Sequence, residues 1–115
     1  MFGHEKLFIY KRARDFNLGL RAYLRRSNLD YPTEDQLRRA GLSVVLNISE
    51  GNGKFTNPDR RRFLIISRNS LLECAAILDI LYNEKSMSKE VFADFYSRAE
   101  ELSRILLKMI NDLGR

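Results

Sequence analysis

A chain of 115 residues is long enough to form one domain with its own buried core. Hydrophobic residues make up 44% of it and charged residues 30%, which excludes a disordered chain, and no apolar stretch is long enough to cross a membrane. The sequence contains only two prolines and six glycines, so long helices can form and we expect an all-α protein.

The formal net charge of +5 is concentrated near the N-terminus, where residues 1–30 hold seven Lys or Arg against three Asp or Glu. A basic excess favours an acidic partner such as nucleic acid, although many soluble proteins carry one without binding any. The N-terminus has no apolar signal core, and the single cysteine, Cys74, cannot form an internal disulfide. Both features point to the cytoplasm, a reducing compartment.

The first predicted helix runs from about residue 6 to residue 27. Apolar residues at spacings of three and four predict its buried stripe, which consists of Ile9, Ala13, Phe16, Leu20, Tyr23 and Leu24. A second face of the same helix carries Leu18 and four basic residues, Lys11, Arg14, Arg21 and Arg25. Pro32 disfavours helix in the residue before it, so we expect a break at residues 28–32.

The second predicted helix covers about residues 33–51. Thr33 is a good N-cap, Gln36 completes a capping box, and Gly51 and Gly53 mark the end of the helix. Its polar residues form one narrow ladder between two apolar ridges. The ladder is Gln36, Arg39, Ser43, Asn47 and Glu50; one ridge is Leu37, Val44 and Ile48, and the other is Leu42 and Leu46. A surface helix needs one apolar stripe, so we expect the second ridge to be buried in the domain or against another chain.

The third predicted helix covers about residues 57–83, with Asn57 as its N-cap and Pro58 at its first position. It is apolar over two faces, one formed by Phe63, Ile66, Ser70, Cys74, Ile77 and Leu81 and the other by Leu64, Leu71, Ala75, Leu78 and Tyr82. The fourth helix, about 88–113 with Ser88 as its cap, repeats apolar residues from Phe92 to Leu113. Four long helices with short loops predict an up-down-up-down four-helix bundle as a single domain over residues 1–115.

Residues that commonly carry catalysis are scarce in this sequence. His4 is the only histidine, which leaves a His-dependent triad or general base without a good candidate. One Cys and one His cannot hold a structural zinc ion, and the two Glu-x-x-His pairs of a di-metal bundle are missing. Cys74 lies on an apolar face and is interpreted as a core residue. We therefore expect no enzyme, no metal and no cofactor.

Glu50 and Glu73 have polar neighbours, which raises the possibility of a catalytic carboxylate pair. Because no base, nucleophile or metal set accompanies them, a structural role is favoured. We interpret these two residues and the ladder as a polar seam between packed surfaces, made of Gln36, Arg39, Ser43, Asn47, Glu50 and Glu73.

Two basic groups are candidates for nucleic-acid contact. The first is the helix face with Lys11, Arg14, Arg21 and Arg25, and the second is Lys54, Arg60, Arg61 and Arg62 around the start of the third helix. Positive charge near a helix N-terminus costs a few tenths of a kcal/mol, which a phosphate backbone would offset; solvated surface charge is the simpler alternative. Most aromatic residues lie on core stripes, so RNA binding would depend on shape and charge and would be salt-sensitive.

Several segments of the chain together resemble one bacterial family. These are Gln36-Leu37-Arg38-Arg39-Ala40, Asn47-Ile48-Ser49-Glu50-Gly51, Phe63-Leu64-Ile65-Ile66-Ser67 and Ser70-Leu71-Leu72-Glu73, and they resemble the four-helix-bundle family encoded in 23S rRNA intervening sequences. The resemblance covers nearly the whole chain. It implies a small cytoplasmic bundle that assembles as a homopentamer and has no established catalytic activity. A distantly similar basic, pentameric bundle of diversity-generating retroelements binds a reverse transcriptase and RNA.

Two functional hypotheses follow. The first is a non-enzymatic homo-oligomeric bundle that binds rRNA, another structured RNA or a ribonucleoprotein through its basic faces. The second is a protein–protein adaptor or scaffold, for example a partner of a reverse transcriptase, that has no direct nucleic-acid contact and assembles through the extra apolar stripes of the second and third helices. Neither hypothesis involves a membrane, and both can hold together because a ring multiplies a modest positive patch through avidity.

Overall fold

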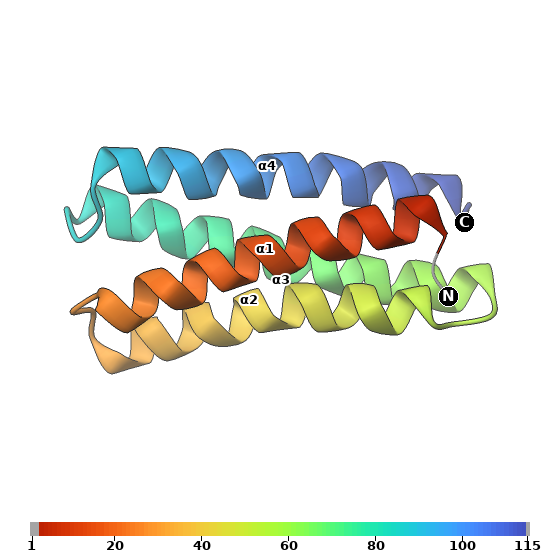
Figure 1. The fold of residues 1–115 in the computed structure, drawn as a ribbon, viewed down its shortest axis with the longest axis horizontal. Helices are drawn as coiled ribbons and strands as arrows, with labels where there is room; N and C mark the ends of the chain where they lie inside the picture. The colour runs from red at the N-terminus through yellow and green to blue at the C-terminus, as the bar shows by residue number, and fades with distance from the viewer. Residues whose placement is uncertain (1–2, 115) are drawn as a thin grey trace.

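The computed structural model describes residues 3–114, and within this range the chain forms four α-helices and no strand. They are α1 (His4–Arg26), α2 (Tyr31–Asn52), α3 (Asn57–Asn83) and α4 (Lys89–Asp112). Successive helices run antiparallel and are joined by short loops at alternating ends of the bundle (Figure 1). Each helix packs on two neighbours, so that α1 and α3 lie diagonally across the bundle from each other, as do α2 and α4. The prediction of an all-α bundle is confirmed.

The start of α2 differs from the prediction because another residue caps the helix. The carboxylate of Asp30, not the hydroxyl of Thr33, is the cap, and it accepts hydrogen bonds from Thr33 N at 3.0 Å and Thr33 Oγ1 at 2.8 Å. These bonds, that from the hydroxyl first, lower the pKa of Asp30. The chain breaks at residues 27–30, close to the predicted residues 28–32, but Pro32 itself lies in the first turn of α2, where no N–H is required.

The N-caps of α3 and α4 are a threonine and a serine hydroxyl, whereas Gly3 at the start of α1 offers no side-chain cap. Thr56 Oγ1 accepts a hydrogen bond from Asp59 N at 3.3 Å, so Thr56 caps α3 in place of the predicted Asn57. Ser88 caps α4 as predicted, because its hydroxyl accepts from Val91 N at 3.2 Å. A side-chain oxygen at each of these positions satisfies a backbone donor that the first turn would otherwise leave unpaired.

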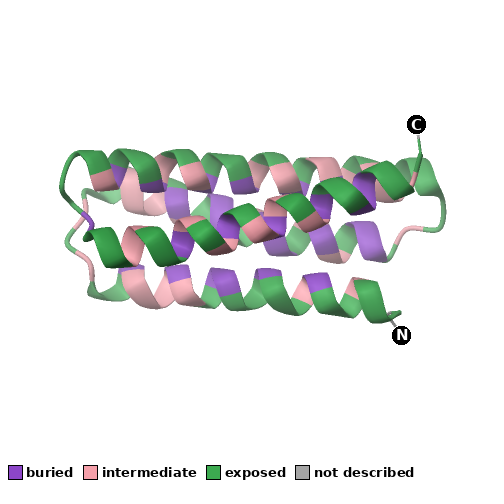
Figure 2. Cartoon of the chain, turned by 90° about the horizontal axis from the view of Figure 1, so that it is seen from above, coloured by how far each residue is buried: buried purple, intermediate pink, exposed green. Residues whose placement is uncertain are grey.

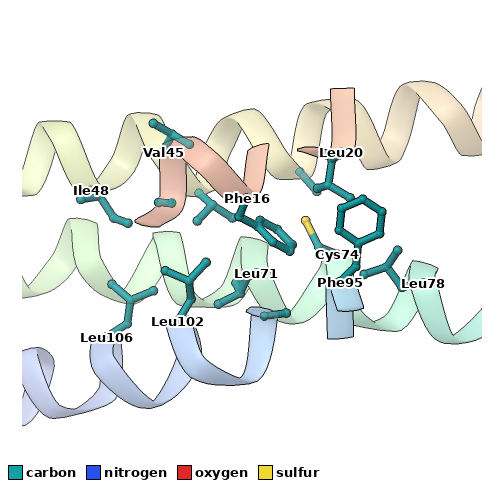
Figure 3. Packing of buried hydrophobic residues seen from close by; sticks show 14 of the residues in the cluster. Phe16, Leu20, Val45, Ile48, Leu71, Cys74, Leu78, Phe95, Leu102 and Leu106 are labelled. Atoms are coloured by element: carbon teal, nitrogen blue, oxygen red, sulfur yellow. The ribbon is translucent and has the colours of Figure 1, made fainter. Parts of the chain in front are cut away.

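The core consists of one inward-facing stripe from each helix (Figure 2). In α1 the predicted stripe is buried from Ile9 to Leu24, while Tyr23 is only partly buried. Figure 3 shows how the four stripes meet, with Phe16 and Leu20 from α1, Val45 and Ile48 from α2, Leu71, Cys74 and Leu78 from α3, and Phe95, Leu102 and Leu106 from α4. The rings of Phe16 and Phe95 pack edge to face with their centroids 6.3 Å apart.

The third helix buries one stripe and not two faces. That stripe takes residues from both predicted faces and consists of Leu64, Ser67, Leu71, Cys74, Leu78 and Leu81. Ile66 remains exposed, and Ala75, Ile77 and Tyr82 are only partly buried. A helix at the corner of a four-helix bundle turns one side toward the core and leaves the opposite side in solvent, so a broad apolar surface cannot be wholly buried.

Two glycines allow close packing of neighbouring helices. At Gly41 a Cβ atom would lie 3.0 Å from Asn17 Oδ1 and 3.1 Å from Leu20 Cδ1, so the glycine lets α2 approach α1. At Gly51 a Cβ atom would lie 3.2 Å from both the Arg60 carbonyl oxygen and Phe63 Cβ. Gly51 thus lets the end of α2 lie against the start of α3, which positions the second basic group.

Candidate functional site

The first basic group lies on the outer side of α1, opposite the stripe that enters the core. Lys11, Arg14 and Arg25 are exposed and Arg21 is partly buried, with Leu18 exposed between them. From position 11 to position 25 this face extends about 21 Å at the rise of an α-helix. Arg14 contacts the neighbouring Asp15 at 3.1 Å, whereas the other three cations form no ion pair with any residue in the range 3–114. The face therefore presents positive charge that the described chain leaves largely uncompensated.

The second basic group is engaged within the turn between α2 and α3. Lys54 Nζ lies 3.5 Å from Glu50 Oε2 and 5.0 Å from the centroid of the Phe63 ring. Arg60 Nε donates a hydrogen bond of 2.7 Å to the carbonyl oxygen of Lys54. Arg62 contacts Asp59 at 3.7 Å and lies 4.5 Å from the centroid of the same Phe63 ring. These contacts stabilise the turn and leave Lys54, Arg60 and Arg62 less available to an anionic ligand.

Arg61 differs from its two neighbours. Its Nε atom is buried and has no hydrogen-bond acceptor among residues 3–114. The side chain lines a shallow, mostly apolar hollow together with Pro58, Arg62, Ile65 and Ile66. Within the second basic group, Arg61 is thus the residue that retains an unused hydrogen-bond donor in residues 3–114.

The polar seam is centred on two serines that face each other between α2 and α3. Ser43 Oγ and Ser70 Oγ lie 2.7 Å apart, and Asn47 Nδ2 donates to the carbonyl oxygen and hydroxyl of Ser43 at 2.9 and 3.0 Å. One end of the seam is closed by a hydrogen bond from Gln36 Nε2 to Glu73 Oε2. The predicted capping role of Gln36 is therefore wrong, because its amide bonds to α3 and not to the start of its own helix.

The other two members of the ladder, Arg39 and Glu50, form their ion pairs with residues of α2 or of the turn that follows it. Arg39 Nε bonds to Asp35 Oδ2 at 3.0 Å, one turn earlier on α2, and Glu50 faces Lys54 one turn later. Neither carboxylate of the seam pairs with Arg39, because Glu50 pairs with Lys54 and the carboxylate that Arg39 contacts is that of Asp35. The structure thus brings Gln36, Ser43, Asn47 and Glu73 together with Ser70 and leaves Arg39 and Glu50 at the edge.

Ser67 forms a buried hydrogen bond that was not predicted from the sequence. Its hydroxyl is fully buried and donates a hydrogen bond of 2.7 Å to the carbonyl oxygen of Val44. A serine one turn from Ser70 on an apolar stripe is the only signal in the sequence that could have indicated it. With Ser43 and Ser70, it fixes the register of α2 against α3 by hydrogen bonds that apolar packing alone would not specify.

Two residues that commonly take part in catalysis, Cys74 and His4, lie far apart in their surroundings, one in the core and one on the surface. Burial, and secondarily the negative charge of Glu73, raises the pKa of Cys74 to about 12, so its thiol stays protonated and is a poor nucleophile at neutral pH. His4 lies exposed at the first residue of α1. No group of three or more His, Cys, Asp or Glu side chains that could hold a metal ion occurs in residues 3–114. Over the same residues, no helix has the length and apolar character needed to cross a bilayer.

These features define a class of protein: a small four-helix bundle with a hydrogen-bonded seam and a basic outer helix face. The sequence profile of 23S rRNA-intervening sequence proteins matches residues 5–108, and the chain belongs to that family. This confirms the resemblance found in the α2 and α3 segments.

The fold is also found in a solved structure. The crystal structure of a protein of unknown function from the S23 ribosomal protein family of Bacteroides thetaiotaomicron matches with a TM-score of 0.87. The match covers 92% of this chain and 97% of that one at 16% sequence identity, so it supports the fold alone. No curated protein matches this sequence. Neither the family description nor that of the Bacteroides protein names a reaction.

Proposed function

We propose that this protein is a non-enzymatic homo-oligomer that binds RNA through the outer face of α1. The RNA is rRNA, another structured RNA or an RNA within a ribonucleoprotein, and the location is the cytoplasm. The observation that carries the proposal is the row of Lys11, Arg14, Arg21 and Arg25 along one side of α1. Membership in a family associated with 23S rRNA supports the choice of RNA as the acidic partner.

The charge state of this row supports contact with phosphate. Lys11, Arg21 and Arg25 have no ion-pair partner in residues 3–114, so a phosphate can approach them without first displacing a carboxylate. Contact between cations and a nucleic-acid backbone releases counterions, which makes the affinity fall steeply as salt increases. Four cations in one subunit give only weak binding, and assembly would multiply it because several faces can engage one RNA.

Exposed apolar residues support self-assembly. Leu46 and Ile80 are more than half exposed, and Leu42, Ile66 and Leu72 are exposed by 39 to 45%. Exposed apolar side chains favour protein–protein contacts, since burying them removes the free-energy cost of their contact with water. The family resemblance implies five subunits, and we propose a pentamer on that basis.

A second candidate function is a protein adaptor, and one loop residue favours it. Phe55, in the turn between α2 and α3, is 94% exposed. A large aromatic side chain fully in water is a common anchor of protein interfaces. A Phe55→Ser variant that retains RNA binding but no longer retains a co-purifying protein partner would favour this adaptor function.

RNA binding is tested by titrating a 23S rRNA fragment with the protein at increasing salt, using fluorescence anisotropy. We expect the triple variant Arg14→Glu, Arg21→Glu, Arg25→Glu to bind at least about 100-fold more weakly at about 0.15 M salt, because three attractive contacts become repulsive. The matched control is Lys85→Glu, Lys89→Glu, Lys108→Glu, which changes the net charge equally at exposed positions in and before α4. Equal losses in both triple variants would show that net charge alone, and not the α1 face, governs binding. Absence of binding by the wild type at low salt would refute the proposal.

A further inference from the structure

The cations on the outer side of α1 belong to a longer row that also contains leucines. Residues three and four positions apart share one face of a helix, and positions 7, 11, 14, 18, 21 and 25 follow that spacing. The six side chains, here named the outer row, are in chain order Leu7, Lys11, Arg14, Leu18, Arg21 and Arg25. Leu7 and Leu18 are exposed by 40 and 54%. The row therefore presents a leucine, two cations, a second leucine and two more cations.

The cations of the outer row form two pairs with a gap between them. At the rise of an α-helix, Lys11 and Arg14 lie about 4.5 Å apart along the helix axis, and Arg21 and Arg25 about 6 Å apart. The axial distance from Arg14 to Arg21 is larger, about 10.5 Å, and Leu18 lies within this interval. The positive charge is thus concentrated at two places that an apolar side chain separates.

We propose that the outer row binds double-stranded RNA, with one cation pair on the phosphates of each strand and Leu18 over the groove between the strands. This inference rests on the proposed RNA binding by α1 and names the form of RNA that this face recognises. The wide groove of a duplex is close in width to the gap, about 12 Å for the major groove of B-form DNA. In A-form RNA the wide groove is the shallow minor groove, across which proteins contact phosphates and 2′-hydroxyls.

The first argument is that the core holds the outer row straight. The helix α1 is uninterrupted (Figure 1), and its other side is buried at intervals from Ile9 to Leu24. The axial spacing of the two cation pairs is therefore fixed, as is the spacing of the two strands in a duplex. Two partners with matching fixed spacing lose little conformational freedom when they bind. A flexible single strand gains no such advantage from the gap.

The second argument is that the outer row lacks the side chains that bind single strands. Proteins that bind single-stranded nucleic acid stack its bases on aromatic rings. The outer row contains no Phe, Tyr or Trp. Phe8, the exposed aromatic residue of α1, lies off the row, and the guanidinium of Arg12 lies 5.0 Å from the centroid of its ring. An apolar Leu18 flanked by cations instead suits the sugar edges and phosphates of a groove.

The third argument is that both cation pairs retain donors for phosphate. Arg21 and Arg25 form no ion pair with any residue in the range 3–114. In the other pair, Lys11 is equally free of ion pairs in that range, while Arg14 contacts Asp15 through Nε and Nη2 and retains Nη1. Each strand of a duplex therefore meets at least one cation that no carboxylate of the described residues occupies.

The test compares duplex and single-stranded RNA in fluorescence anisotropy titrations at about 0.15 M salt. The probes are an RNA duplex of about 16 base pairs, the length that a double-stranded RNA-binding domain spans, and one of its strands alone. We expect the wild type to bind the duplex at least about tenfold more tightly than the strand. A DNA duplex of the same sequence should bind at least about threefold more weakly than the RNA duplex, because the wide groove of B-form DNA is about 8.5 Å deep.

A rearranged row tests the gap itself. The double variant Leu18→Arg, Arg25→Leu keeps the composition and net charge but places the four cations in one continuous run at positions 11, 14, 18 and 21. We expect its duplex-to-strand affinity ratio to fall to about one. The matched control Leu107→Lys, Lys108→Leu exchanges an exposed leucine and an exposed lysine on α4 and should keep the wild-type ratio. Circular dichroism verifies that both variants are folded.

The outcomes separate this inference from the proposed function. Equal affinity of the wild type for duplex and strand, or a duplex preference that survives in the Leu18→Arg, Arg25→Leu variant, would overturn duplex recognition and leave RNA binding by α1 intact. A DNA duplex that binds as tightly as the RNA duplex would overturn the assignment to the shallow groove. Absence of binding to either form of RNA at low salt would instead refute the proposed function itself.

Discussion

The two basic groups of this protein look alike in sequence but differ in what surrounds them in the folded chain. On α1, Lys11, Arg21 and Arg25 extend from a helix side whose described neighbours supply no carboxylate partner. At the turn between α2 and α3, Lys54 and Arg60 have a carboxylate, a carbonyl oxygen and an aromatic ring nearby.

The comparison shows that a cluster of cations acquires its role from its surroundings. A guanidinium that donates to a backbone carbonyl contributes to the stability of a turn, whereas one in water contributes little to stability and remains able to meet a phosphate. We therefore expect substitutions in the turn to change the free energy of unfolding and substitutions on α1 to change RNA affinity.

The largest effect on stability is expected where the turn is most tightly packed. Gly51→Leu should lower the free energy of unfolding by about 2–3 kcal/mol, because its Cβ atom would start 3.2 Å from the Arg60 carbonyl oxygen and Phe63 Cβ. Chemical denaturation monitored by circular dichroism measures the change. The control is Gly53→Leu, since a Cβ atom there meets its nearest neighbours at an ordinary 3.6 Å. Equal losses at both glycines would mean that the α2–α3 contact is not the cause.

Removal of the turn's shortest charged hydrogen bond should have the next largest effect. Arg60→Ala should lower the free energy of unfolding by about 1.5 kcal/mol, because the 2.7 Å bond to the Lys54 carbonyl oxygen is lost. Arg62→Ala should cost less, about 0.5–1 kcal/mol, since its contact with Asp59 is long and exposed and its contact with the Phe63 ring lies at the surface. The same denaturation experiment compares the two variants. A larger loss of unfolding free energy for Arg62→Ala than for Arg60→Ala would show that Arg62, and not Arg60, stabilises the turn more.

The two basic groups should differ most clearly in how much each contributes to RNA affinity. The double variant Arg21→Ala, Arg25→Ala should weaken binding of a 23S rRNA fragment about tenfold at about 0.15 M salt, because two phosphate contacts are removed. The double variant Arg60→Ala, Arg62→Ala removes the same charge and should weaken binding less than about threefold. A larger loss of RNA affinity in the Arg60→Ala, Arg62→Ala variant would indicate that RNA contacts the turn between α2 and α3 and not the face of α1.

The smallest expected effect concerns the stability of α1. Arg25→Ala should leave the free energy of unfolding within about 0.5 kcal/mol of the wild type, because the exposed side chain forms no ion pair within residues 3–114. A thermal melt of the variant beside Arg60→Ala is sufficient for the comparison. A loss of 1 kcal/mol or more would show that Arg25 has a structural contact in the folded protein.

Much of the fold was predictable because the spacing of apolar residues along a helix indicates which face of that helix is buried. The stripe from Ile9 to Leu24 is buried as its spacing indicated, and the core residues of α4 follow the same repeat. Helix starts were harder to predict: both Asp30 and Thr33 are good N-caps, and the choice between them depends on where Pro32 fits in the first turn. Neighbouring positions with similar propensities leave such alternatives open.

The seam was predictable only in part. The ladder on α2 correctly indicated an edge with polar character, but Gln36 and Thr33 also fitted a local capping box. Only the position of α3 reveals that Gln36 reaches Glu73 and that Ser70 faces Ser43. A hydrogen bond between helices depends on their relative height and rotation, and periodicity within one helix does not define either.

Because 3.6-residue periodicity and capping act locally, the sequence alone indicates that this protein is helical, about where the four helices of residues 3–114 lie, and which residues of α1 and α4 face the core. It also determined the family, through the segments of α2 and α3. The packing of the helices, in contrast, sets which cations are paired and which are available, and leaves a hollow between α3 and α4 beside Ala75 and Ala99. The physical reason is that ion pairs, hydrogen bonds between helices and hollows all depend on residues far apart in the chain, which the packing of the helices brings to the same place.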